Sequence, residues 1–362
     1  MKEIAEFIIA GHPDKICDRI ADKIVDFACQ RDPLSLVGVE IALHRHLVVV
    51  TGCVTTFPIA TEDDLKKLIF EVFFEAGYGD DWEPHPKDIT LIFDVRFEEL
   101  DEDLRNLRVM SDDQAICIGY AVNKPEQNYL PLAHRFAYLA GQRMTELRRE
   151  YGTGPDGKVI VTTQGNSIER ISFSFHHREN TSMTHLFKKA NRIAIELGLQ
   201  DLSKIVVNGG GDFDVGGPFG DNGLSGKKLV VDAYGPSIPI GGGAWSGKDP
   251  HKIDRVGGLI ARKLAVRALR SGFGHEAKIV LGYHPGDRQP SIQHLFIDNQ
   301  KRPFEWLGKK DLSIEGIHKE LKLDQINFAD YANGSWFQKS APWNVNAVHT
   351  NHERYSTTLE NQ

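Results

Sequence analysis

The 362-residue sequence has few cysteines, no long apolar run and no excess of positive charge. Its four cysteines form no C-x-x-C pair, which argues against a disulfide scaffold or a cysteine metal cluster and is typical of a reduced cytoplasmic protein. No run of about 18 apolar residues occurs, so no membrane span is expected. The first apolar run is short and interrupted by acidic residues, so no signal peptide is predicted. The net charge of −7 gives no indication of a nucleic-acid partner.

What the chain does have is an ordinary globular composition, with 41% hydrophobic and 26% charged residues, and a length that predicts two or three domains. Hydrophobic periodicity predicts strands at 3–10, 37–42, 46–54, 89–95, 115–122, 158–163, 168–175, 229–233, 277–283 and 291–297. It predicts helices at 14–30, 61–78, 130–151, 183–199, 252–271 and 312–321. Residues 97–108 are acidic and are expected to form a mobile loop or a short helix. Beyond about residue 322 we expect a loose tail, with Trp336, Phe337 and Trp343 as candidate anchors.

Residues 208–255 are the most informative stretch, because three glycine clusters, four lysines and isolated carboxylates lie within it. Glycine lets backbone N–H groups approach an anion, lysine supplies positive charge, and aspartate oxygen binds Mg²⁺. The composition therefore suits a bound polyphosphate, and the alternative is a glycine-rich surface loop. Residues 242–249 approach the P-loop pattern, but Asp249 replaces the required hydroxyl and no strand precedes them, so a P-loop is not predicted.

A second candidate anion site is the start of the first helix. Pro13 suits the first helical position, which places Asp14 in the first turn beside His12. The alternative interpretation is structural: Asp14 complements the helix dipole and His12 caps the helix or lies in the core. Several other candidates also have a structural alternative, since each taken alone resembles a surface, turn or packing residue: Glu40, Cys53, Asp156, Lys158 and Lys252.

Several long motifs resemble one family. They are GHPDKICDRIAD at 11–22, GGPFGDNGLSGKK at 216–228, DAYG at 232–235 and GGGAWSGKDPHKIDR at 241–255. Asp113-Gln114 followed by GYA, PLAHR at 131–135 and GPDGK at 154–158 add to them. In this order, over residues 5–290, they resemble the S-adenosylmethionine synthetases (methionine adenosyltransferases). The resemblance implies an α+β fold of three similar domains with pseudo-threefold symmetry, which we place at 1–108, 109–213 and 214–362.

The resemblance also implies a reaction. Family members join methionine to ATP: the sulfur attacks C5′ of the ribose, and tripolyphosphate leaves and is hydrolysed to phosphate and diphosphate. The reaction uses Mg²⁺, with two ions expected, and K⁺, in a site shared between two subunits. We therefore expect a cytoplasmic homodimer or dimer of dimers in one-carbon metabolism that binds ATP and a small-molecule acceptor, with neither nucleic acid nor membrane as a partner.

Matching motif positions assign roles to individual residues. Asp14 and Asp254 would bind Mg²⁺, and Glu40 would bind K⁺. The catalytic set would be His12, Lys158, Lys248 and Lys252, with His12 on the phosphate chain. Lys228 and the three lysines of that set would bind tripolyphosphate, and Lys227 stands where many members have arginine. Asp113, Asp156 and Phe213 would border the nucleoside; Asp221, Lys252 and Cys53 would face the acceptor, and Asp221 also the ribose.

The acceptor half departs from the family pattern. Ala10 and Cys53 stand where the family has glutamate, Ala115 replaces a glycine, and residues 97–108 and 282–287 replace two family segments. Losing the charged partner of the methionine ammonium group costs about 1.5–3 kcal/mol, or about 10- to 150-fold in affinity. Methionine then binds weakly, or is held by other side chains such as His44, His46, Glu98 or Glu99, or another acceptor replaces it.

Two further alternatives remain open, namely cleavage of ATP to tripolyphosphate without transfer and a silent regulatory partner of a genuine synthetase. The retained phosphate and metal residues argue against a silent partner.

Overall fold

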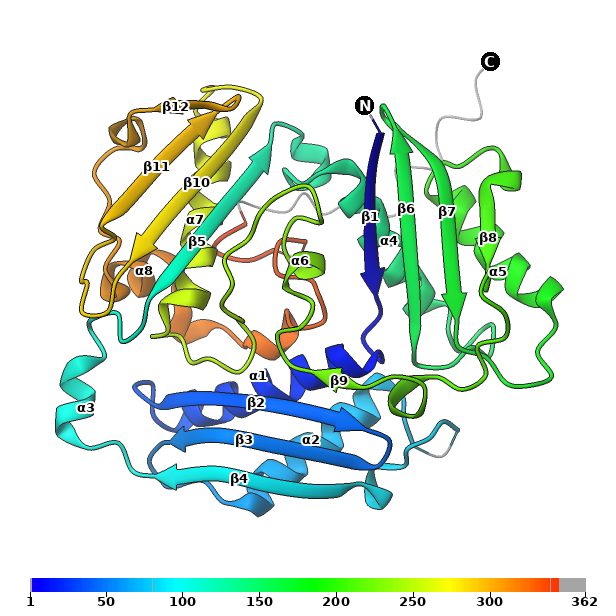
Figure 1. Ribbon diagram of the computed structural model, residues 1–362, viewed down its shortest axis with the longest axis horizontal. Coiled ribbons are helices and arrows are strands. Elements are labelled where there is room, and N and C mark those ends of the chain that lie inside the picture. Colours follow the sequence, from blue (N-terminus) through cyan, green and yellow to red (C-terminus); the bar gives the residue numbers. More distant parts are fainter. Residues whose placement is uncertain (1, 80, 339, 345–362) are drawn as a thin grey trace.

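The computed structural model describes residues 2–79, 81–338 and 340–344, and contains three four-stranded sheets arranged around a central group of helices and loops (Figure 1). The first sheet has the order β1 (Lys2–Ile8), β6 (Gly157–Gln164), β7 (Ser167–Phe175), β8 (Ile205–Val207). The second has the order β12 (Gln300–Arg302), β11 (Ile292–Ile297), β10 (Glu276–Tyr283), β5 (Ala115–Val122). The third has the order β4 (Thr90–Glu98), β3 (Leu47–Thr55), β2 (Leu36–His44), β9 (Gly223–Leu224). The predicted α+β class with three similar units is confirmed.

The helices are α1 (Pro13–Arg31), α2 (Glu62–Ala76), α3 (Glu102–Leu107), α4 (Leu132–Glu146), α5 (Met183–Glu196), α6 (Leu229–Asp232), α7 (Ile253–Arg270) and α8 (Ile314–Leu321). Within the described residues, none of them has the length and hydropathy needed to cross a bilayer.

Three strands pair outside their own third of the sequence. β1 joins β6 antiparallel, β5 joins β10 antiparallel, and β9 adds to β2. Each sheet therefore contains strands from two different thirds of the sequence. The domain boundaries at 108/109 and 213/214 stay a prediction.

Helix α1 shows why the local sequence folds as it does. His12 is the N-cap and its Nδ1 accepts a hydrogen bond from the Asp14 N–H, while Pro13 occupies the first helical position. Ile16, Ile20 and Ile24 recur every four residues and are completely buried. This apolar face packs against β2 and α2. The packing fixes the start of α1 next to the loop that contains β9.

Two predictions about local structure are wrong. Residues 229–233 form the short helix α6 and its C-cap rather than a strand, because a run of so few apolar residues carries no decisive periodicity. The tail is also not loose as far as it is described: Trp336, Phe337 and Trp343 are buried, and Asp26 of α1 accepts N–H groups from Phe328 and Ala329. The three aromatic anchors are thus confirmed, while residues 345–362 lie outside the described residues.

Buried Lys189 on α5 gives a test of the fold through pH. Its Nζ donates to the Met144 carbonyl (2.9 Å) and to Thr153 Oγ1 (2.6 Å) and lies 4.9 Å from the Phe175 ring centroid. Burial lowers the pKa of Lys189 from 10.5 to about 7, so the folded chain favours the neutral amine whereas the unfolded chain favours the ammonium. The contribution of Lys189 to stability must therefore increase as pH rises from about 7 towards 10.5.

We expect wild-type protein to gain about 1–2 kcal/mol of unfolding free energy between pH 7 and pH 9 relative to Lys189→Met. Urea denaturation at the two pH values measures the difference. Exposed Lys188 on the same helix is the matched control, and Lys188→Met should follow the wild type. Parallel behaviour of Lys189→Met and wild type would contradict the neutral amine.

Candidate functional site

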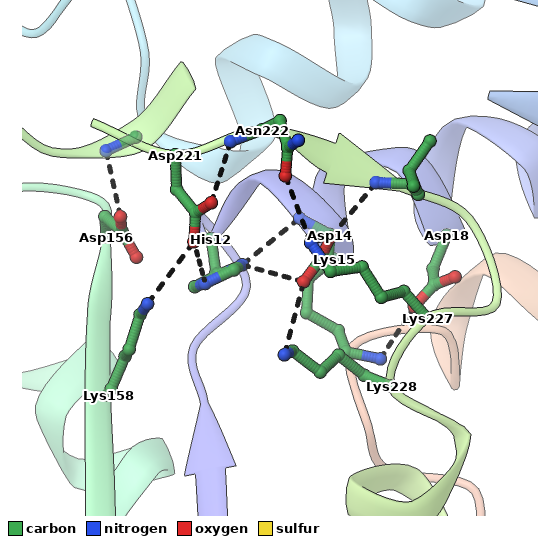
Figure 2. Close-up of polar contacts among 12 residues, drawn as sticks. His12, Asp14, Lys15, Asp18, Asp156, Lys158, Asp221, Asn222, Lys227 and Lys228 are labelled. Carbon is green, nitrogen blue, oxygen red and sulfur yellow. Dashed lines mark hydrogen bonds and ion pairs between the residues drawn. The ribbon is translucent and has the colours of Figure 1, made fainter. Parts of the chain in front are cut away.

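The N-terminus of α1 brings together residues from three distant segments (Figure 2). Asp14 is completely buried, and its Oδ1 accepts a hydrogen bond from the Leu224 N–H at 3.0 Å. Lys227 Nζ lies 3.2 Å from Oδ1 and Lys228 Nζ lies 3.5 Å from Oδ2 of the same carboxylate. One buried carboxylate thus faces two cations from the loop after β9.

The other side of this cluster is formed by β6 and by the loop before β9. Lys158 Nζ lies 3.4 Å from Asp221 Oδ2, which in turn lies 3.7 Å from His12 Nε2 (Figure 2). His12, Asp14, Lys158, Asp221, Lys227 and Lys228, all predicted from the sequence, are therefore neighbours in space. We call these six residues the α1 cluster.

Burial and the surrounding lysines set the protonation of His12. The pKa of His12 falls to about 2, first because the ring is buried and then because Lys158 and Lys228 repel a further positive charge. Nδ1 accepts from the Asp14 N–H, so in the neutral ring Nε2 carries the proton. Nε2 has no hydrogen-bond partner among the described residues. His12 therefore presents a neutral N–H donor that is free for an anionic oxygen.

Asp156 holds together two of the segments that form the α1 cluster. Its Oδ1 accepts from the Gly157 N–H (2.7 Å) and its Oδ2 from the Gly217 N–H (2.9 Å), which ties β6 to the loop that carries Asp221. Burial raises the pKa of Asp156 to about 6. Gly217 has a φ of +62° and its Cα lies against Tyr78, so a side chain there would clash with the hydroxyl.

The remaining phosphate and metal candidates form a second set at the start of α7. Lys248 pairs with Asp254, and Lys252 pairs with Asp112. A Cβ added at Gly243 would lie 2.1 Å from the Asp254 carboxyl carbon, which explains the glycine. We call Lys248, Lys252 and Asp254 the α7 set.

Strand β2 shows how far apart the two groups lie within one chain. The backbone of Lys248 forms an isolated β-bridge with Gly38 of β2. Leu224, which lies beside the α1 cluster, pairs with Ala42 of the same strand. Four residues of a strand span about 13 Å. Neither group reaches the other through an ion pair or hydrogen bond among the described residues, and those residues contain no set of three His, Cys, Asp or Glu placed to hold a metal.

The other predicted residues are more scattered. Asp113 is exposed and accepts from the Gln114 N–H; Phe213 is half-buried, with its ring centroid 5.5 Å from that of His176. Glu40 is exposed on β2, and Cys53 on β3 is partly buried.

Sequence reasoning missed the acidic row of α1. Asp14, Asp18 and Asp22 accept N–H groups from Leu224, Gly226 (2.7 Å) and Gly247 (2.9 Å), and Asp26 accepts from the C-terminal segment. Both glycine-rich loops are thus fixed on one helix face by charged acceptors, each contributing about 1.5–3 kcal/mol. Carboxylates at every fourth position of a predicted helix were the available signal, although a row of cations, Lys15, Arg19 and Lys23, lies beside them in the sequence.

The register of the third sheet reveals another missed residue. Cys53 pairs with Arg96 of β4, whose Nε lies 3.3 Å from Glu98 Oε2. A cation therefore neighbours the position where the acceptor's ammonium anchor was expected. Glu98, one of the alternative anchors, is itself engaged by that cation.

Comparisons with known proteins complete the site's description. The profile of the S-adenosylmethionine synthetase N-terminal domain matches residues 3–95, and that of the C-terminal domain matches residues 215–345. The chain is 31% identical to an S-adenosylmethionine synthase of Mycoplasma pneumoniae over 94% of this chain and 92% of that protein. It is 32% identical to that of Mesoplasma florum, over 92% and 94%. A solved structure titled as an unusual S-adenosylmethionine synthetase from Campylobacter jejuni superposes with a TM-score of 0.86 at 26% identity, covering 95% of this chain and 97% of that one.

Proposed function

The chain belongs to the S-adenosylmethionine synthetase family, and from that premise we propose that it is a cytoplasmic enzyme that transfers the adenosyl group of ATP, with methionine as the acceptor. The observation that carries the proposal is the α1 cluster, in which a neutral histidine N–H, a buried carboxylate and three lysines converge at one helix N-terminus. Such a site suits a leaving group with several negative charges.

The side chains act by charge and position. Lys158, Lys227 and Lys228 would hold the triphosphate, and the Nε2–H of His12 would donate to an oxygen of the phosphate chain as the bond to C5′ breaks. Because His12 stays neutral, it stabilises developing charge without releasing a proton. Fixing the sulfur about 3–3.5 Å from C5′ can supply about 7–11 kcal/mol of the barrier.

The chemistry of Asp14 fits Mg²⁺. Its Oδ2 is buried and accepts no hydrogen bond from the described residues, although two lysines are near. A buried carboxylate oxygen without a hydrogen-bond donor is costly, so Asp14 would hold a hard divalent cation, which would supply positive charge to the site. Magnesium ions, when bound, would neutralise charge on the leaving phosphates. Glu40 offers a single exposed carboxylate, so K⁺ binding there rests on the family alone.

We further propose that a second copy of the chain completes the site. The α7 set carries the other half of the predicted phosphate and metal ligands but lies about four strand residues from the α1 cluster. A homodimer with two-fold symmetry would give each site one α1 cluster and the partner's α7 set.

A second candidate function is transfer to an acceptor other than methionine. The surroundings of Cys53 favour it, because cysteine offers no carboxylate to an ammonium group and the neighbouring Arg96 holds Glu98 in an ion pair. Cleavage of ATP without transfer, or a silent regulatory role, are the remaining alternatives.

One experiment tests the proposal. The protein is incubated with ATP, Mg²⁺ and K⁺, with and without methionine, and adenosyl and phosphate products are identified by mass. We expect a methionine-dependent sulfonium product together with phosphate and diphosphate. Cleavage of ATP without that product supports another acceptor or simple cleavage, and no turnover contradicts an enzymatic role.

A further inference from the structure

A pocket of about 510 Å³ lies between the C-terminal ends of α2 and α4 and the segment after α2. Its lining includes Phe74, Trp82, Arg148, Arg149 and Arg178. Its volume is in the range of pockets that take small molecules of nucleotide size. None of the residues predicted for ATP, metal or acceptor lines it.

Two of the arginines, Arg148 and Arg149, have no carboxylate partner in the part of the chain that the structure describes. Arg148 Nη1 donates to the Ala76 carbonyl at 2.8 Å, and burial together with neighbouring Arg149 lowers the pKa of Arg148. Among the described residues, no carboxylate comes within ion-pair distance of either guanidinium, whereas Arg178 pairs with Asp81 at 3.1 Å. In a chain of net charge −7, two adjacent cations without a carboxylate mark a local site for an anion.

The same pocket has aromatic walls. Phe74 is 54% exposed, which is unusual for a phenylalanine at the end of a core helix, and its ring lies perpendicular to that of His85, with the centroids 5.7 Å apart. Trp82 is half-buried, with the Arg178 guanidinium 5.5 Å and the His176 ring centroid 4.5 Å from its own ring centroid. An exposed phenylalanine ring in the same pocket as two adjacent arginines suits a planar ring joined to a negative group.

Tyr78 separates this pocket from the α1 cluster. Its ring lines the pocket, while its buried hydroxyl donates to the Gly11 carbonyl at 2.6 Å and lies against Gly217. The pocket is therefore a site of its own rather than an extension of the first.

We propose that this pocket binds a small ligand in which a phosphate is joined to a planar ring, of which a nucleoside monophosphate is the simplest example. The phosphate would lie on Arg148 and Arg149, and the ring on Phe74 and Trp82. The proposal does not depend on the reaction proposed above.

Calorimetric titration of AMP into the full-length protein tests it. We expect Arg149→Gln to bind AMP about 10- to 150-fold more weakly than wild type, the loss that follows from one charged hydrogen bond. Arg170→Gln removes an exposed arginine of β7 and should bind like wild type. Phe74→Ala should weaken AMP binding but leave binding of inorganic phosphate unchanged.

Asp14→Asn, which alters the α1 cluster, distinguishes the two sites. It should keep the AMP binding that Arg149→Gln loses, while Arg149→Gln should keep wild-type turnover. The proposal is overturned if AMP fails to bind at millimolar concentration, if Arg149→Gln binds it like wild type, or if Asp14→Asn alone abolishes binding. Failure of turnover in the wild type would leave this result unaffected.

Discussion

Replacing Asp14 by asparagine, or Lys248 by alanine, should lower turnover by on the order of 10²–10³-fold while the fold stays intact. Asparagine preserves the acceptor for the Leu224 N–H but removes the charge that faces Lys227 and Lys228. Lys248→Ala removes a cation of the α7 set and leaves Asp254, in the first turn of α7, without its lysine partner. Product formation measures the loss, and circular dichroism checks the fold.

Mixing the two inactive variants tests the shared site. In a mixed dimer, one of the two sites combines an intact α1 cluster from one subunit with an intact α7 set from the other. After subunit exchange, random pairing should therefore restore about a quarter of wild-type turnover. Exposed Lys67→Ala on α2 is the control for a lost surface lysine and should be fully active. Wild-type rates in either single variant would remove the phosphate assignment, and no recovery on mixing would place both groups in one subunit's site.

Lys15→Met should destabilise the protein by about 3–5 kcal/mol. Lys15 Nζ is completely buried and lies 2.7 Å from Asp18 Oδ2 and 2.5 and 2.6 Å from the oxygens of Asp232. The two carboxylates raise the pKa of Lys15, so the ammonium persists in the core. Without it, two buried carboxylates are left facing each other, and a methionine of similar length cannot compensate for their charge.

Urea unfolding of Lys15→Met and of the double variant Lys15→Met/Asp232→Asn separates charge from packing. The double variant should recover part of the loss, since it also removes one buried carboxylate. A single-variant loss under about 1 kcal/mol, or no recovery in the double variant, would show that the ion pair is not what holds α6 to α1.

Local structure could be predicted well from the sequence where a periodic pattern was long. The isoleucines of α1 and the Thr61 cap of α2, whose capping box with Asp64 is formed, are examples. The strand prediction for residues 229–233 was wrong because four apolar residues between glycine-rich loops fit a strand and a helix turn equally well. The pairing of β1 with β6, across about 150 residues, has no local signal at all.

The site could be predicted from the sequence only as a set of residues. His12, Asp14 and the lysines converge as expected, but their division into two groups depends on where β9 and the Lys248 loop dock along β2. Arg96 could not be placed beside Cys53 without the register of β3 and β4. The spacing of residues in the sequence predicts which side chains are neighbours within one helix or strand. Contacts between helices and strands can be known only from the folded structure.

The four aspartates of α1 also affect the order in which contacts can form while the chain is being translated. Their backbone donors arrive some 200 to 300 positions later in the chain, at Leu224, Gly226, Gly247, and Phe328 with Ala329. During translation the carboxylates of this helix emerge long before these backbone donors, although Lys15 can pair with Asp18 at once. The hydrogen bonds that fix both glycine-rich loops and the C-terminal segment on α1 therefore form only after most of the polypeptide has emerged.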